Sequence, residues 1–157
     1  MLAALAAAMP RAEVVLTHAG SIRVDDILPP PLTQYDIVPS LPFGGSLQEV
    51  EIQGRLLTKV LEQGRKMPVA AGIWFTTMPL PTTRPTNAWK LKNIVISPAK
   101  TYRVAMNDFL LTVKEVNLDY SNPTHPDMAR VFKTKTARPN PQSDVRLAIV
   151  RYLEKKP

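Results

Sequence analysis

Sixteen prolines divide this chain of 157 residues into short segments. Proline lacks an amide hydrogen and fixes φ, so it interrupts the interior of helices and sheets. Pro10 ends an Ala/Leu-rich helix over 1–9, the run Pro29–Pro31 enforces extended backbone, and three further prolines make 78–87 a loop. The remaining segments mix helical and strand-like patterns without regular βαβ alternation. We therefore expect a single α+β domain.

Side-chain periodicity assigns the segments between the prolines to strands and helices. The expected strands are 13–17, 46–54, 73–78, 88–96, 101–107 and 131–136. The expected helices are 34–40 after the cap Thr33, 55–64 ending at Gly64, one turn at 109–112 after Asp108, and a closing helix that begins after Ser143 or Asp144. These caps are residue types that satisfy the free backbone groups at helix ends.

The composition excludes several classes of protein. A hydrophobic fraction of 45% and a mean hydropathy of −0.09 are ordinary for a globular domain, so disorder of the whole chain is excluded. No apolar stretch approaches the roughly 18 residues of a membrane-spanning helix. The chain has no cysteine and two histidines, which excludes a disulfide framework and leaves little material for an imidazole-rich metal centre.

The net charge of +7 favours anionic partners, such as nucleic acid, phosphorylated small molecules or an acidic membrane surface. The basic residues are scattered, however, and no run reaches the length of about five that marks a nucleic-acid tail. A solvated basic surface is therefore the favoured interpretation of the charge.

No catalytic constellation is recognisable in the sequence. Asp25 and Asp26 are adjacent, so on extended backbone their carboxylates point to opposite sides. The segment 44–46 lacks the lysine of a phosphate-binding loop. His125 lies between prolines and is expected in a surface loop. We therefore predict no catalytic residue and no metal ligand in this chain.

The turn 19–23 is the most chemically suggestive segment. Small residues after a strand can expose successive backbone amides, and Arg23 follows Gly20 by three residues. Amides and a guanidinium together suit a phosphate, a carboxylate or ribose hydroxyls. The alternative is an ordinary turn that carries a surface arginine.

Phe43 stands between Pro42 and the pair Gly44–Gly45. Because neither glycine has a side chain that could cover the ring, the ring can be displayed as a stacking platform for a planar base. The alternative is a buried core phenylalanine that follows the helix over 34–40. The sequence alone leaves both interpretations open.

Four segments, considered together, resemble the C-terminal domain of the 5′-nucleotidase family, whose members include ecto-5′-nucleotidase, UDP-sugar hydrolase and 2′,3′-cyclic-nucleotide phosphodiesterase. They are VVLTHAGSIRVDD, LTQYDIVPSLPFGGSLQEVEIQGRLLTKVLEQG, TYRVAMNDFLLTVKEVNLDY and DVRLAIVRYLEK. The resemblance runs from about residue 1 to 155, and it is specific in combination. It implies one domain over 1–157, layered as helix, sheet, sheet and helix, with 1–10 as the remainder of a truncated helix.

The resemblance also implies a division of labour. In the family, an N-terminal metallophosphoesterase domain holds two divalent metals, and the C-terminal domain binds the nucleoside part and carries it to the metals by rotation. The metal-binding motifs are absent here, so no metallophosphoesterase domain and no cofactor are expected in this chain. The implied function is nucleotide recognition for a phosphoester hydrolase of nucleotide catabolism, with no catalysis in isolation.

The resemblance assigns substrate-binding positions residue by residue. Arg23 matches a substrate-contacting arginine, Phe43 matches one of two rings that sandwich the base, and His18 stands where the family has asparagine. Asn117 or Leu118 occupies the place of the second ring, and Tyr120 is the nearest aromatic residue. The candidate substrate-binding residues are Arg23, Phe43, Gly20, Ser21, His18, Gly45 and Asn117.

The expected partner is a nucleotide or nucleoside, together with a metallophosphoesterase domain in cis or in trans; neither nucleic acid nor a membrane span is expected. The chain is then a fragment, a split subunit or a mis-started product. Relatives imply a periplasmic or extracellular location, although residues 1–9 lack the charged start of an export signal. Two alternatives stay open: a stand-alone binding protein derived from this fold, and a basic nucleic-acid-binding protein.

Overall fold

The computed structural model describes residues 1–24, 27–66, 73–76, 88–112, 121–132 and 140–155. Its α-helices are α1 (Leu2–Ala8), α2 (Gln34–Ser40), α3 (Gly54–Lys66) and α4 (Val145–Leu153), with 3-10 turns η1 (Ala19–Ser21) and η2 (Asp108–Leu111). Its strands are β1 (Val14–His18), β2 (Leu47–Gln53), β3 (Ile73–Thr76), β4 (Lys90–Leu91), β5 (Ile94–Val95), β6 (Thr101–Asn107) and β7 (Met128–Phe132). The mixture of elements confirms the predicted α+β class.

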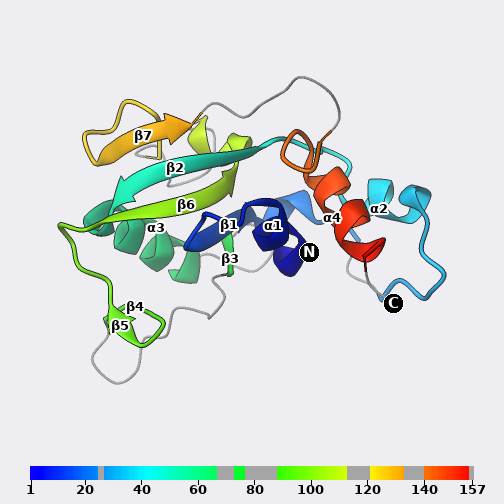
Figure 1. Ribbon diagram of the computed structural model, residues 1–157, viewed down its shortest axis with the longest axis horizontal. Helices are drawn as coiled ribbons and strands as arrows, with labels where there is room; N and C mark the ends of the chain where they lie inside the picture. Colours follow the sequence, from blue (N-terminus) through cyan, green and yellow to red (C-terminus); the bar gives the residue numbers. More distant parts are fainter. Residues whose placement is uncertain (25–26, 67–72, 77–87, 113–120, 133–139, 156–157) are drawn as a thin grey trace.

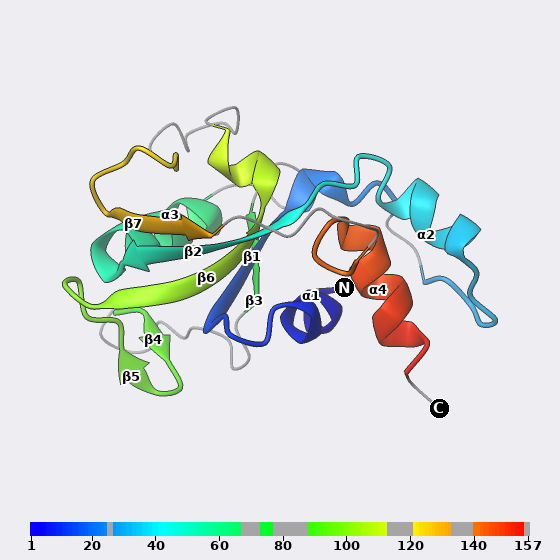
Figure 2. The same cartoon turned by 45° about the horizontal axis from the view of Figure 1, so that its top comes forward.

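Five strands form one mixed sheet in the order β3-β1-β6-β2-β7 (Figure 1). Strands β1 and β6 are parallel, and the other neighbours are antiparallel. Strands β4 and β5 form a separate two-stranded sheet. Figures 1 and 2 both place this hairpin at the opposite end of the molecule from α2 and α4, and both chain ends near α4.

Helices cover both faces of the five-stranded sheet because its central strands alternate between two apolar clusters. On one face, Val50 and Val104 pack with Leu57 of α3 in the larger cluster. On the other face, Leu47 and Ala105 pack in a cluster with residues of α1 and α4. The period of two along β2 and β6 therefore places two helical layers on opposite sides of one sheet.

Two of the predicted helix caps are confirmed. The backbone amide and hydroxyl of Thr33 both donate to the Asp36 carboxylate, at 2.6 and 2.7 Å. These hydrogen bonds hold the pKa of Asp36 below its ordinary value. Asp144, rather than Ser143, caps α4, because its carboxylate accepts from the Arg146 amide at 2.8 Å.

Several predicted boundaries are wrong, and helix α3 also begins one residue earlier than expected, at Gly54. Helix α3 continues past Gly64 to Lys66 because Gly64 lies on the buried face of the helix and does not need to reverse the chain. The expected strand 88–96 is a hairpin, because Lys92 and Asn93 adopt positive φ of 50° and 64° and turn the chain back. Asn107, not Asp108, caps η2.

Other predicted segments lie only partly within the described residues. The expected strand 73–78 is seen as β3. The strand expected at 131–136 begins earlier, because β7 starts at Met128, which pairs with Ile52 of β2. The remaining residues of both segments, like the loop 78–87 and the pair Asp25–Asp26, lie outside the described residues.

Candidate functional site

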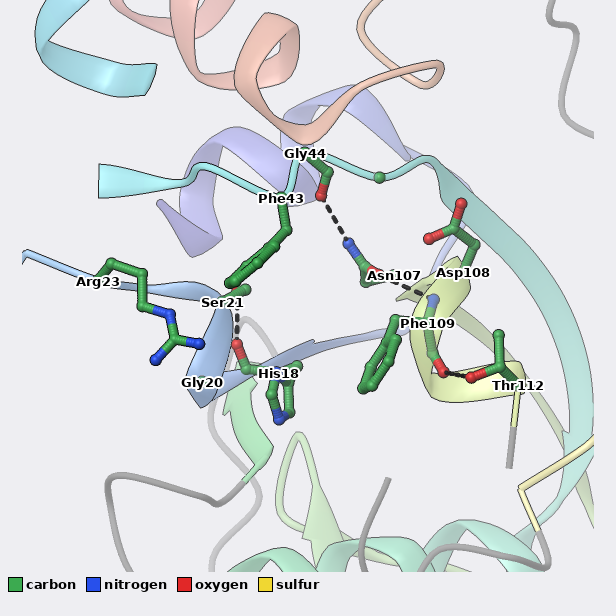
Figure 3. A pocket seen from close by; sticks show the side chains of 11 residues that line it. His18, Gly20, Ser21, Arg23, Phe43, Gly44, Asn107, Asp108, Phe109 and Thr112 are labelled. Carbon is green, nitrogen blue, oxygen red and sulfur yellow. Dashed lines mark hydrogen bonds between the residues drawn. The ribbon is translucent and has the colours of Figure 1, made fainter. Parts of the chain in front are cut away.

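A pocket of about 560 Å³ lies where β1 and β6 end (Figure 3). Because these strands are parallel neighbours, η1 and η2 both begin at the same edge of the sheet. The loop between α2 and β2 completes the wall. The lining residues are His18, Gly20, Ser21, Arg23, Phe43, Gly44, Gly45, Asn107, Asp108, Phe109 and Thr112. A cavity of this volume is in the range that holds a small organic ligand.

The turn η1 forms the first wall. The Ser21 hydroxyl donates to the His18 carbonyl at 2.6 Å, which closes the turn on itself. A Cβ atom at Gly20 would lie 2.4 Å from Cε1 of the His18 ring, so this position accepts only glycine without movement of that ring. The Arg23 amide donates to the Ser40 carbonyl at 2.9 Å and thereby ties the turn to α2.

Phe43 supplies the most exposed ring of the pocket. The residue is 67% exposed, so the interpretation as a buried core phenylalanine is wrong. The loop can display the ring because Gly44 and Gly45 adopt φ of +60° and +99°, a region that other residues rarely enter. The Arg23 guanidinium carbon lies 5.0 Å from the centroid of the Phe43 ring, within cation–π distance.

The Arg23 side chain is exposed and forms no ion pair with an acid in the part of the chain that the structure describes. Its guanidinium lies against the Phe43 ring and carries five hydrogen-bond donors. A cation and an aromatic ring thus stand next to each other at the same wall (Figure 3).

The segment Asn107–Phe109 forms the opposite wall. The buried Asn107 side chain accepts from the Phe109 amide at 2.9 Å and donates to the Gly44 carbonyl at 3.4 Å. The Phe109 ring lies 5.3 Å from the His18 ring, measured between centroids, with the planes tilted by 49°. The wall therefore adds a second exposed ring, which Figure 3 shows across the pocket from Phe43.

Asp108 places a carboxylate at the same wall. Its Oδ2 accepts from the amide and the hydroxyl of Ser46, at 3.0 and 2.8 Å. A Cβ atom at Gly45 would lie 2.9 Å from Oδ1 of Asp108. The loop can pass this close to the Asp108 carboxylate because glycine has no side chain. The pocket accordingly offers an acceptor on one side and a guanidinium on the other.

A salt bridge supports the Phe43 loop from behind. Arg146 donates through Nε to Asp144 at 2.9 Å, and this carboxylate raises the pKa of Arg146. A Cβ atom at Gly44 would lie 2.7 Å from the Arg146 guanidinium, and the Val145 amide donates to the Gly45 carbonyl at 2.9 Å. The start of α4 therefore fixes the conformation of the loop.

Six of the seven predicted substrate-binding residues line this one pocket: His18, Gly20, Ser21, Arg23, Phe43 and Gly45. The seventh, Asn117, lies outside the described residues, as do Leu118 and Tyr120. His125 lies elsewhere, where its Nδ1 accepts from the Asp127 amide at 3.1 Å.

Sequence reasoning missed the contributions of Asn107, Asp108 and Phe109 to the pocket. Their pattern indicates only the end of a strand and one helical turn. The signal that could have identified them is their position: the polar pair and the ring directly follow β6, and β6 is parallel to β1, the strand that precedes Gly20. That parallel pairing is not visible in the sequence.

Within the described ranges, no group of three or more His, Cys, Asp or Glu side chains could hold a metal ion. Likewise, none of the helices in the described ranges is both long and apolar enough to cross a bilayer.

Comparison with protein families finds a match over residues 1–118 to the family described as 5′-nucleotidase, C-terminal domain. The match contains most of the strands of the sheet and all of the residues that line the pocket. A comparison with curated proteins finds no significant match.

Solved structures with the same fold include a 5′-nucleotidase precursor from Thermus thermophilus, with a TM-score of 0.73 and 18% identity. An NAD nucleotidase from Haemophilus influenzae gives a TM-score of 0.66 at 15% identity. A protein from Staphylococcus aureus, described as a candidate 5′-nucleotidase in complex with alpha-ketoglutarate, gives 0.62 at 13% identity.

The alignments cover 98% of this chain and 31%, 28% and 32% of those three structures. The chain therefore spans about a third of the length of these similar proteins. At these identities the likeness establishes the shared fold.

Proposed function

This chain belongs to the family of 5′-nucleotidase C-terminal domains, and from this premise we propose that its pocket binds a nucleoside or nucleotide. One observation carries the proposal: an exposed ring, Phe43, stands 5.0 Å from a guanidinium, Arg23, that has no acidic partner among the described residues. A nucleotide offers a planar base for the ring and an anion for the guanidinium. The two groups thus match the two chemically different ends of one ligand.

The two walls divide the proposed recognition between them. The base stacks on Phe43, and the Arg23 guanidinium donates to the phosphate or to sugar hydroxyls. On the other wall, Oδ1 of Asp108 accepts from a sugar hydroxyl while its Oδ2 is held by Ser46. The pair Gly44–Gly45 lets the loop lie against Arg146 on one side and against Asn107 and Asp108 on the other.

Hydrolysis is proposed to occur outside the described residues. Two divalent metals in a metallophosphoesterase domain, in cis or in trans, would polarise the phosphoryl group and activate water. The pocket would hold the nucleoside part of the substrate for that centre. The protein would thus serve nucleotide catabolism as a recognition domain, with nucleic acid not among its ligands.

The chain alone is expected to have no phosphohydrolase activity, because the described residues lack a cluster of metal ligands. The assay uses the purified chain with AMP, a UDP-sugar and an aryl phosphate, in the presence of manganese, cobalt or zinc. Background release of phosphate is the expected result. Metal-dependent turnover that persists through repurification would show that the chain carries its own catalytic centre.

Replacing Arg23 with glutamine is expected to weaken AMP binding about tenfold, because a charge-assisted hydrogen bond contributes roughly 1.5–3 kcal/mol. The melting temperature should stay nearly unchanged, since the exposed guanidinium supports no ion pair among the described residues. Isothermal titration calorimetry and thermal melts measure the two effects. Arg151→Gln, an exposed arginine on α4 paired with Glu154, is the matched control. Equal AMP affinity of Arg23→Gln and wild type would exclude Arg23 from the site.

A further inference from the structure

We propose that the β4–β5 hairpin docks on an anionic lipid surface and contacts it with the exposed side chains of Ile94 and Val95. Lys90 and Lys92 supply the positive charge of the contact. This surface is separate from the pocket, because the hairpin precedes the first residue of β6 and the pocket lies at the last residue of that strand. Figures 1 and 2 both show the hairpin as a projection at one end of the molecule.

The hairpin displays two aliphatic side chains at its tip. Ile94 is 73% exposed and Val95 is 51% exposed, whereas the neighbouring Leu91 and Ile96 are buried in the larger core cluster. Trp89 also packs against that cluster. The base of the hairpin is therefore anchored in the core, while apolar surface at the tip stays in water and would gain free energy by leaving it.

The apolar groups lie on both faces of the hairpin. Ile94 and Val95 are consecutive residues of one strand, so their side chains point to opposite faces. A rigid protein surface could cover one of these faces, whereas lipid headgroups and acyl chains surround an inserted tip on every side. The placement therefore favours a lipid surface, where apolar side chains are buried at the boundary between headgroups and acyl chains.

Each exposed aliphatic side chain has lysines beside it. Lys90 is the cross-strand partner of Val95, and a hollow of about 100 Å³ is lined by Ile94 together with Lys92 and Lys100. Neither Lys90 nor Lys92 forms an ion pair with any residue that the structure describes. A lysine can lie along apolar surface while its ammonium group reaches a phosphate, which is the arrangement that an anionic lipid surface requires.

The turn of the hairpin keeps a positive charge at the tip. Lys92 and Asn93 adopt φ of 50° and 64°, in a two-residue turn where glycine and asparagine are usual and lysine is rare. Residues 88–96 contain no acid. Glu13 lines the hollow and lies 4.0 Å from Lys100, so lysines outnumber acids around the tip. The charge of the tip thus complements a negative surface.

Co-sedimentation with lipid vesicles tests the proposal. The probes are vesicles of phosphatidylglycerol mixed with phosphatidylcholine, and vesicles of phosphatidylcholine alone. We expect the full chain to bind the mixed vesicles more tightly than the neutral ones, and added salt to weaken the binding. Ile94→Ser/Val95→Ser should weaken binding at least about tenfold through lost apolar burial. Lys90→Gln/Lys92→Gln should weaken binding to the mixed vesicles about tenfold.

Two double variants are matched controls. Ile27→Ser/Val38→Ser removes two exposed aliphatic side chains, one before α2 and one on it, at the other end of the molecule. Lys66→Gln/Lys155→Gln removes the same charge as the lysine variant of the hairpin, from two other exposed lysines. Vesicle binding of both controls should stay close to that of wild type. Melting temperatures of all four variants should also stay close to that of wild type, since none of these side chains is buried.

A fluorescent label tests whether the tip itself meets the lipid. The chain has no cysteine, so Val95→Cys and Val38→Cys each accept a single environment-sensitive fluorophore. We expect the emission of the label at position 95 to shift to the blue with mixed vesicles, and that of the label at position 38 to stay unchanged. Equal behaviour of the two labels would contradict docking through the hairpin.

Three further results would overturn the proposal. The first is absence of binding to the mixed vesicles, and the second is wild-type binding by Ile94→Ser/Val95→Ser. The third is an equal loss in the two lysine variants, which would indicate attraction by the net charge of the chain alone. If the hairpin variants lose binding to soluble poly-glutamate but keep vesicle binding, the hairpin is a site for an acidic protein segment instead. AMP binding is measured separately, so either proposal can fail without the other.

Discussion

Replacing Phe43 with alanine is expected to weaken nucleoside binding roughly five- to a hundredfold while the free energy of unfolding changes little. The ring is 67% exposed, so its removal leaves no cavity in the core. Base–aromatic stacking tolerates every base, so the loss should be similar for adenosine and uridine. If Phe43 stacks on the base, the Phe43→Ala variant loses nucleoside affinity and keeps its stability. If Phe43 packs in the core, the same variant loses stability and keeps its nucleoside affinity.

Calorimetric titration and thermal melts of the Phe43→Ala variant measure both quantities. Tyr35→Ala is the matched control, because Tyr35 is a similarly exposed aromatic residue on α2 that does not line the pocket. A buried phenylalanine would instead lose about 3–5 kcal/mol of unfolding free energy on truncation. A loss of that size with unchanged nucleoside affinity would reject the stacking role.

Replacing Gly54 with alanine is expected to reduce the free energy of unfolding by at least about 1–3 kcal/mol, the usual cost of overpacking. A Cβ atom at this position would lie 2.0 Å from the Ser97 carbonyl oxygen and 3.0 Å from the Tyr102 ring. The Gly54 amide also donates to the Lys100 carbonyl at 2.8 Å. The new methyl group would therefore push two backbone segments apart where β2 leads into α3.

Urea denaturation followed by circular dichroism measures this loss. Lys66→Ala, at the exposed last position of the same helix, is the control and should change stability little, because alanine is a good helix former. A Gly54→Ala variant as stable as wild type would show that the junction of β2 and α3 is wider than described.

Local signals predicted those parts of the fold that depend on neighbouring residues. The capping pair Thr33–Asp36 and the cap Asp144 act within one helical turn, so the sequence reveals them. The end of α3 could not be predicted in this way. Gly64 has the residue type of a helix terminator, but its burial in the tertiary structure decides that the helix continues.

The candidate site was predicted on one wall and missed on the other. Arg23 and Phe43 each lie in a short segment whose small residues already suggest an exposed group. Phe109 gave no such signal, because it follows an ordinary apolar strand. Its position in the pocket depends on the parallel pairing of β6 with β1, which joins segments far apart in the chain.

The contact between Arg23 and Phe43 was not predicted either. The two residues are twenty positions apart in the sequence, with α2 between them, and the hydrogen bond from the Arg23 amide to the Ser40 carbonyl brings them together. The support of Gly44 by Arg146 is likewise a contact across the chain. Such contacts follow from tertiary packing and not from local sequence patterns.

A titration of AMP into the wild-type chain and into Arg23→Gln and Phe43→Ala tests the central claim most directly. The account predicts binding of one AMP per chain, weakened in both variants while their melting temperatures stay close to that of wild type. AMP that does not bind the wild-type chain, or binds both variants with wild-type affinity, would contradict it.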